Sequence, residues 1–203
     1  MWRKRVARGF VPLVLAALLA GCDGGSGKGP ESTLPPPPPS TTTTTIDVTK
    51  VPATIDVAYV QAVMNSLDKV TGDMVRTLVA NKVPNAEFFA LLQAIYDEPQ
   101  FGVEQSDYGN YAALGLRQLS MSPGNPTSKV KRILDTSANC LVAEIDHDYG
   151  PIFREPPPED EGGFIQLRSK KSERDPAGKN PTTWAIVADI DAQDAKIPQD
   201  PCK

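Results

Sequence analysis

Residues 140–149 read CLVAEIDHDY, and from Ala143 onward the residues of one face alternate with acids of the other. The first face carries Leu141, Ala143 and Ile145, and the opposite face carries Glu144, Asp146 and Asp148. A period of two residues predicts a β-strand with one buried and one solvated face. His147 and Tyr149 fall on the same face as the apolar residues, so we expect both side chains to point inward.

The residues that precede this strand follow the period of a helix instead. Apolar side chains recur every three or four residues, which predicts a long amphipathic helix, at Val57, Val60, Met64, Leu67, Met74 and Leu78. Thr54 or Asp56 can cap its start, and Asn81 with Pro84 ends it. A second helix is expected to begin after Asn85 and to stop at Pro99. A weaker third helical segment runs from Asp107 to Leu119.

Further extended segments follow the Pro123–Pro126 turn. They are predicted at 130–134, 164–170 and 183–190, where Trp184, Ile186 and Ala188 would share one face. Helices followed by antiparallel strands predict an α+β fold with the helices on one sheet face. Four strands and about 140 residues are enough for a single core.

The N-terminus has the pattern of an export signal. Basic residues at 3–5 and at Arg8 precede an 11-residue apolar run, Phe10–Ala20. An uncleaved membrane anchor would need about 18–20 apolar residues, so this run is too short to span a bilayer. A soluble secreted protein would lack a cysteine at the cleavage site. Here Leu19-Ala20-Gly21-Cys22 resembles the lipobox of bacterial lipoproteins.

That resemblance implies removal of residues 1–21 and attachment of a diacylglyceride to Cys22. Two acyl chains give a stable anchor, whereas one chain binds a membrane only marginally. We therefore expect a protein held at the extracytoplasmic face of a bacterial cell membrane. Residues 22–53 are rich in Gly, Pro and Thr and predict a disordered tether, either unmodified or O-glycosylated. The α+β domain would then comprise residues 54–203.

Charge and composition exclude some partners and metal sites. Four of the 21 basic residues precede Cys22, which leaves 17 against 25 acidic residues in the mature chain. A net charge near −8 argues against nucleic acid and against electrostatic binding to anionic lipid. The single histidine, His147, excludes a multi-histidine metal site. The acids at 144, 146 and 148 could hold Ca²⁺, but a solvated sheet face is the simpler interpretation. No metal or other cofactor is expected.

The two cysteines after Cys22 are Cys140 and Cys202. In an exported chain such a pair predicts a disulfide, with two free thiols as the alternative. The bond would tie back a C-terminal tail that contains two prolines and few apolar residues, and that has no reason to order by itself.

The order of elements and the closing segment Thr183–Val187 resemble the cystatin-like, nuclear-transport-factor-2-like α+β cone. Members of that superfamily include isomerases, dehydratases and non-enzymatic binding modules, so the resemblance does not fix a function. Its enzymes place an acid or histidine with a tyrosine inside the cone. His147 and Tyr149 are the only residues here that resemble such a pair, and Trp184 would lie beside them in a pocket.

Two hypotheses follow. The first is a non-enzymatic binding or assembly module that contacts another envelope protein or a small apolar ligand. The second is a small cone-fold enzyme or carrier for a hydrophobic molecule, in which His147 would act on a ligand carbonyl or as a general base.

Overall fold

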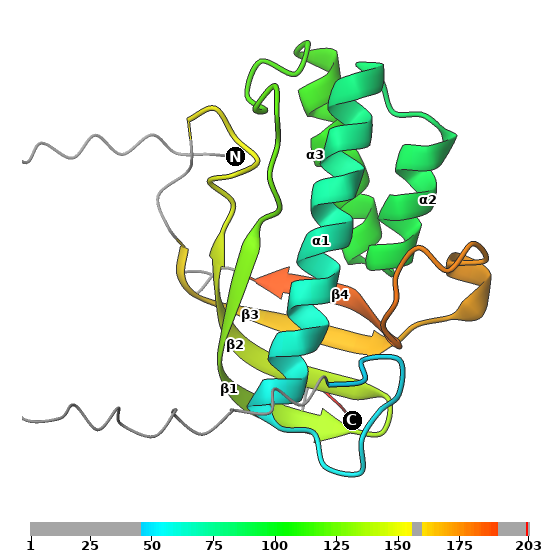
Figure 1. Cartoon of the computed structure of the whole chain (residues 1–203), viewed down its shortest axis with the longest axis vertical. Coiled ribbons are helices and arrows are strands. Elements are labelled where there is room, and N and C mark those ends of the chain that lie inside the picture. The colour runs from blue at the N-terminus through cyan, green and yellow to red at the C-terminus, as the bar shows by residue number, and fades with distance from the viewer. Residues whose placement is uncertain (1–45, 156–159, 191–201, 203) are drawn as a thin grey trace, which may run out of the picture. The chain divides into compact units, whose positions relative to one another are not determined.

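The computed structural model describes residues 46–155, 160–190 and 202 of the chain, with the side chains of 160–162 excepted (Figure 1). The elements in chain order are α1 (Val57–Asn81), α2 (Ala86–Ile95), α3 (Gln100–Ala113), β1 (Thr127–Ser137), β2 (Cys140–Asp148), β3 (Asp160–Ser169), the short 3₁₀ helix η1 (Ser172–Arg174) and β4 (Trp184–Ile190). The predicted signal peptide, lipobox and most of the tether lie outside the described residues, as does most of the tail after Ile190.

Three helices and a four-stranded antiparallel sheet confirm the predicted α+β fold. The strands lie in the order β1-β2-β3-β4, so each is paired with its neighbour in the chain. Figure 1 shows α1 crossing one face of the sheet, with α2 and α3 packed beside it. Buried side chains from the helices and from that face form the core, including Met64, Leu92, Ile145 and Trp184.

The first two helices begin where the sequence places their caps. The Asp56 carboxylate accepts the Tyr59 N–H at 2.8 Å, and the Asn85 side chain accepts the Phe88 N–H at 2.9 Å. Each bond satisfies a backbone donor that lacks a partner in the first turn of a helix. Helix α1 ends at Asn81, and the capping residue after it, Lys82, has a left-handed backbone with φ of 64° and donates its N–H to Leu78 O.

The third helix begins seven residues earlier than predicted and ends six residues earlier. It begins at Gln100, directly after Pro99, and ends before Gly115, whose φ is 68°. Proline is well tolerated at the start of a helix, so Pro99 precedes α3 as well as following α2. Only Gln100 and Tyr108 of this helix are buried. The helix therefore lacks the apolar stripe by which its extent could have been recognised.

A β-bulge changes which residues of β4 face the core. Leu167 pairs with Ile186, but the preceding residue, Gln166, pairs with Ala188, so one extra residue lies in β4. Trp184 and Ile186 face inward as predicted. After the bulge the alternation reverses, because an extra residue moves every later side chain to the other face. The expectation that Ala188 shares the inner face is therefore wrong, and Asp189 faces inward instead.

Backbone groups at both edges of the sheet are occupied. On β1, the Gln61 side chain accepts the Val130 N–H at 2.9 Å and donates to Ser128 O at 2.7 Å. One amide thus makes the pair of bonds that a neighbouring strand would make. On β4, the Asp97 N–H donates to Ile186 O at 2.9 Å, and the Gln100 side chain accepts the Asp189 N–H at 3.2 Å.

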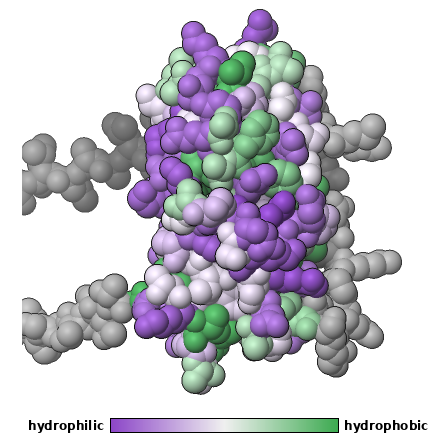
Figure 2. Space-filling model, turned by 90° about the vertical axis from the view of Figure 1, so that its right-hand side faces the viewer, coloured by the Kyte–Doolittle hydropathy of each residue, from purple (hydrophilic) through white to green (hydrophobic). Residues whose placement is uncertain are grey.

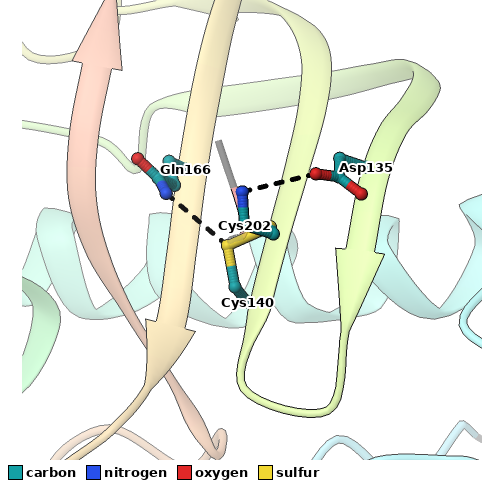
Figure 3. Close-up of a disulfide and its surroundings, with 4 residues drawn as sticks. All are labelled: Asp135, Cys140, Gln166 and Cys202. Carbon is teal, nitrogen blue, oxygen red and sulfur yellow. Dashed lines mark hydrogen bonds between the residues drawn. A yellow bond between two sulfur atoms is a disulfide. The ribbon is translucent and has the colours of Figure 1, made fainter. Parts of the chain in front are cut away.

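The predicted disulfide is present. Cys140 and Cys202 are bonded, with Cα atoms 5.4 Å apart, and they are 62 positions apart in sequence. Figure 3 shows the Cys202 N–H donating to the Asp135 carboxylate, at 3.3 Å, and the Gln166 amide donating to the Cys140 sulfur, at 3.5 Å. The C-terminal cysteine is therefore fixed beside the β1–β2 hairpin by a covalent bond and by a hydrogen bond to β1.

The segment before α1 belongs to the fold as well. Val48 and Ile55 pack against the core, and Val48 precedes the expected domain start at residue 54. Within the described residues, no helix is long and apolar enough to cross a membrane. Figure 2 looks onto the side that α2 and the β3–β4 connection form, where a broad hydrophilic area crosses the middle of the face.

Candidate functional site

The single histidine of the chain lies inside a cluster of polar side chains between the helices and the sheet. His147 is near the end of β2, on the inner face, and is 8% exposed. The register of the sheet places it opposite Ser128 of β1. Because Ile145 and Ala143 precede it on the same face, the alternation that buries the core also buries this imidazole.

Ser128 joins the histidine to helix α1. Its hydroxyl donates to Asp68 Oδ1 at 2.8 Å, and its backbone N–H donates to Asp68 Oδ2 at 2.8 Å. The same hydroxyl oxygen lies 3.0 Å from His147 Nδ1. A hydroxyl has one hydrogen, and here it goes to the carboxylate. With Asp68 ionised, His147 Nδ1 must therefore carry a hydrogen and donate it to Ser128.

Asp189 joins the histidine to β4 and α3. Its Oδ1 lies 3.5 Å from His147 Nε2, and its Oδ2 accepts the Tyr149 hydroxyl at 3.1 Å. The Tyr149 ring stacks on the imidazole, with centroids 5.1 Å apart and 27° between the planes. Gln100, which accepts the Asp189 N–H, donates through its own amide to Glu104 at 2.9 Å.

Burial shifts the protonation of the acids in this cluster. It raises the pKa of Asp68 from 3.8 to about 6, against the opposing effects of the Ser128 hydrogen bonds and of His147. It also raises the pKa of Glu104 from 4.5 to about 7, with the Gln100 bond opposing and Asp189 adding to the rise. Burial lifts the pKa of the Tyr149 phenol well above its ordinary value of 10. The two acids can therefore change protonation in mildly acidic solution.

The structure brings two of the predicted site residues together and separates the third. His147 and Tyr149 are in contact. Trp184 is fully buried elsewhere in the core, where its indole N–H donates to the Tyr59 hydroxyl at 2.9 Å. The acids of the opposite strand face pair with basic side chains of β1: Glu144 with Arg132 at 2.6 Å, and Asp146 with Lys131 at 2.7 Å.

A metal site is not apparent in the described part of the chain, where no group of three or more metal-ligating side chains is arranged to hold an ion.

Sequence reasoning missed the residues that surround His147. Asp68 could have been found, because it is an acid between Leu67 and Thr71 on the apolar side of α1. Ser128 alternates with Val130, but a serine near the start of a strand carries no signal by itself. Asp189 could not have been found, because the bulge in β4 reverses its direction.

A hollow of about 450 Å³ lies at the start of α1, and its lining shares no residue with the polar cluster around His147. It is bordered by Ile46, Asp47, Lys50, Val51, Pro52, Thr54, Asp56 and Tyr59. Neither His147 nor Tyr149 contributes to it. Its volume falls within the range of small-molecule sites, roughly 300–1,000 Å³.

Comparisons with known proteins give no assignment. The chain matches no protein-family model, and no curated protein or solved structure shows a significant match.

Proposed function

We propose that this protein is an exported lipoprotein that acts as a non-enzymatic binding or assembly module of the bacterial cell envelope. Cys22 would carry the diacylglyceride, residues 22–53 would form the tether, and the α+β domain would face away from the cytoplasm. The observation that carries the proposal is the Cys140–Cys202 disulfide. Such bonds form and persist in oxidising compartments, which agrees with export through the signal at residues 1–21.

The interior of the domain supports binding over catalysis. The hydroxyls nearest to His147 are both engaged, Ser128 with Asp68 and Tyr149 with Asp189. Ser128 is 6% exposed and Asp68 8% exposed. A nucleophile or general base must reach a substrate atom within about 2.6–3.2 Å, and here each such group is within reach of its protein neighbour. Partner contact would then use the outer surface of the domain.

The cone-fold enzyme or carrier is the second candidate. The observation in its favour is the stacked imidazole and phenol of His147 and Tyr149, which share the Asp189 carboxylate. On this hypothesis a hydrophobic molecule would enter beside Tyr149, which is half-buried.

Fractionation of a bacterial host tests the anchor. The wild-type protein should be found in the membrane fraction and should incorporate a labelled fatty acid. Cys22→Ser should lose the label and leave that fraction, because the acyl chains are its only proposed attachment. Cys202→Ser is the matched control: it removes a cysteine and should leave label and location unchanged. A Cys22→Ser protein that stays in the membrane with unchanged mass would refute the anchor.

Cross-linking in intact cells separates the two functions. A binding module should give the same cross-linked envelope protein in repeated experiments, and His147→Gln should leave the yield unchanged. A carrier or enzyme should instead release a hydrophobic molecule on extraction of the purified protein, in an amount that His147→Gln and Tyr149→Phe reduce. The second result would overturn the non-enzymatic binding proposal.

A further inference from the structure

The polar cluster forms a chain of contacts across four separate elements. Asp68 of α1 bonds to Ser128 of β1, Ser128 to His147 of β2, and His147 Nε2 lies 3.5 Å from Asp189 of β4. Asp68 and Ser128 are 60 positions apart in sequence. This series of contacts therefore links parts of the fold that are far apart in sequence, and the His147 imidazole lies at its centre.

Acids of several elements surround the imidazole, and the sheet register also places Asp160 of β3 opposite His147. Asp68 approaches from α1 and Asp189 from β4, while Glu104 of α3 is linked to Asp189 through Gln100. The electrostatic influence of His147 extends to both Asp68 and Glu104. The other titratable groups of the cluster are the phenols of Tyr96, Tyr108 and Tyr149, all neutral because burial raises the pKa of each well above 10.

The protonation state of His147 decides what its second nitrogen offers to Asp189. When Nδ1–H donates to Ser128, a neutral imidazole presents an unprotonated Nε2, which is an acceptor, toward a carboxylate oxygen that is also an acceptor. A protonated imidazole presents an N–H there. The 3.5 Å contact between His147 Nε2 and Asp189 Oδ1 then becomes a charge-assisted attraction. The hydrogen bond from Nδ1–H to Ser128 is kept.

We propose that the contact between His147 and Asp189 is a proton-operated latch, which holds the end of β4 onto β2 when His147 is protonated and loosens when it is not, while the bonds among Asp68, Ser128 and His147 keep the imidazole in place in both states. The proton is exchanged with water, which can reach the cluster at Asp189, whose side chain is 20% exposed. This latch is independent of the proposed anchor, because it needs only the folded domain.

The acids of the cluster act in the same direction. The pKa of Asp68 is raised from 3.8 to about 6 and that of Glu104 from 4.5 to about 7. A carboxyl whose pKa is higher in the folded state favours the fold when protonated. Its contribution is complete below the unfolded value and is lost as the pH rises through the folded value. Stability should therefore fall between about pH 4 and pH 7, whereas native acids that are paired or hydrogen-bonded usually give the opposite trend.

Thermal unfolding at pH 5.5 and pH 7.5 gives the first test. The wild-type melting temperature should be higher at pH 5.5. In His147→Gln the amide can still bond to its neighbours but cannot take up a proton, so the difference should shrink to the part supplied by Asp68 and Glu104. Asp73→Asn is the control: the side chain of this acid is 40% exposed, burial raises its pKa less than the hydrogen bonds from Arg76 and Lys69 lower it, and the substitution should leave the difference intact. The latch would be overturned if the melting temperatures of His147→Gln at the two pH values differed as much as those of the wild type, or if those of the wild type did not differ.

A second test needs no substitution, so it holds even if His147→Gln fails to fold. Because the chain has one histidine, the imidazole gives a single set of NMR signals that reports its protonation directly. Hydrogen exchange corrected for its intrinsic pH dependence should show the Asp189 amide losing protection at least several-fold as that imidazole loses its proton. Amides of α2, which is outside the cluster, should not follow. Equal changes in α2, or none at Asp189, would refute the latch.

Discussion

Loss of the Cys140–Cys202 disulfide should lower the stability of the domain by a large amount. The bond joins positions 62 apart in sequence. Cross-linking across a loop of that length removes chain entropy from the unfolded state worth about 4 kcal/mol. For a folded unit of about 150 residues, each kcal/mol corresponds to roughly 2–4 °C in melting temperature, so reduction should lower it by roughly 8–16 °C.

Calorimetry with and without a reductant, in a Cys22→Ser background, measures this directly. The Cys140→Ala/Cys202→Ala double variant is the matched control, because reductant should leave its melting temperature unchanged. Cys140 is 5% exposed, so alanine is used there to avoid burying an unpaired hydroxyl. The hydrogen bond from Cys202 N–H to Asp135 would be lost along with the bond. A shift below about 2 °C on reduction would refute the entropic reasoning.

Three further substitutions test the packing and the buried hydrogen bonds. Gly72→Ala should destabilise the domain by about 1–3 kcal/mol in chemical denaturation, because an added Cβ would overlap the Asn125 side chain and lie 3.0 Å from the Asn125 Cα. Gly109→Ala is the control, because the space around Gly109 is open. It should stabilise α3 by about 0.5–1 kcal/mol in the same measurement. Asn180→Ala should lower the free energy of unfolding by about 3 kcal/mol or more. This side chain is 2% exposed, donates to Ala94 O and Trp184 O, and accepts the Thr182 N–H. A loss below about 1 kcal/mol in urea denaturation would show that these three bonds do not stabilise the fold as expected.

The parts of the fold with a strong hydrophobic period could be predicted from the sequence. Helix α1, its Asp56 cap, the start of helix α2 and the inward face of β2 all match expectation, because burial of a regular stripe dominates their placement. Helix α2 ends at Ile95, before the predicted stop at Pro99. The extent of α3 could not be predicted, since its contacts with β4 leave most of its surface exposed. Its start depends on Pro99, and a proline between two helical segments can mark either the end of the first helix or the beginning of the second.

The candidate site was predictable only in part. The inward direction of His147 follows from simple alternation along β2, and so does its nearness to Tyr149. Its partners come from three other elements and depend on how those elements meet. A single extra residue in β4 turns Asp189 toward the imidazole, and local sequence offers no sign of a bulge at that point. For Trp184 too, the inward direction was predicted but the partner was not, because Tyr59 lies 125 positions away in sequence.

The occupied edges of the sheet bear on how copies of the protein could behave when crowded. Open strand edges attract further strands and so begin aggregation. Here the Gln61 amide occupies the Ser128–Val130 stretch of β1, and the Asp97 backbone with the Gln100 side chain occupies part of β4. Molecules held at a membrane by the proposed anchor would share a plane, where their local concentration would be far above that in solution. Edges closed by the chain's own groups would let such molecules collide repeatedly at these stretches without adding strand to strand.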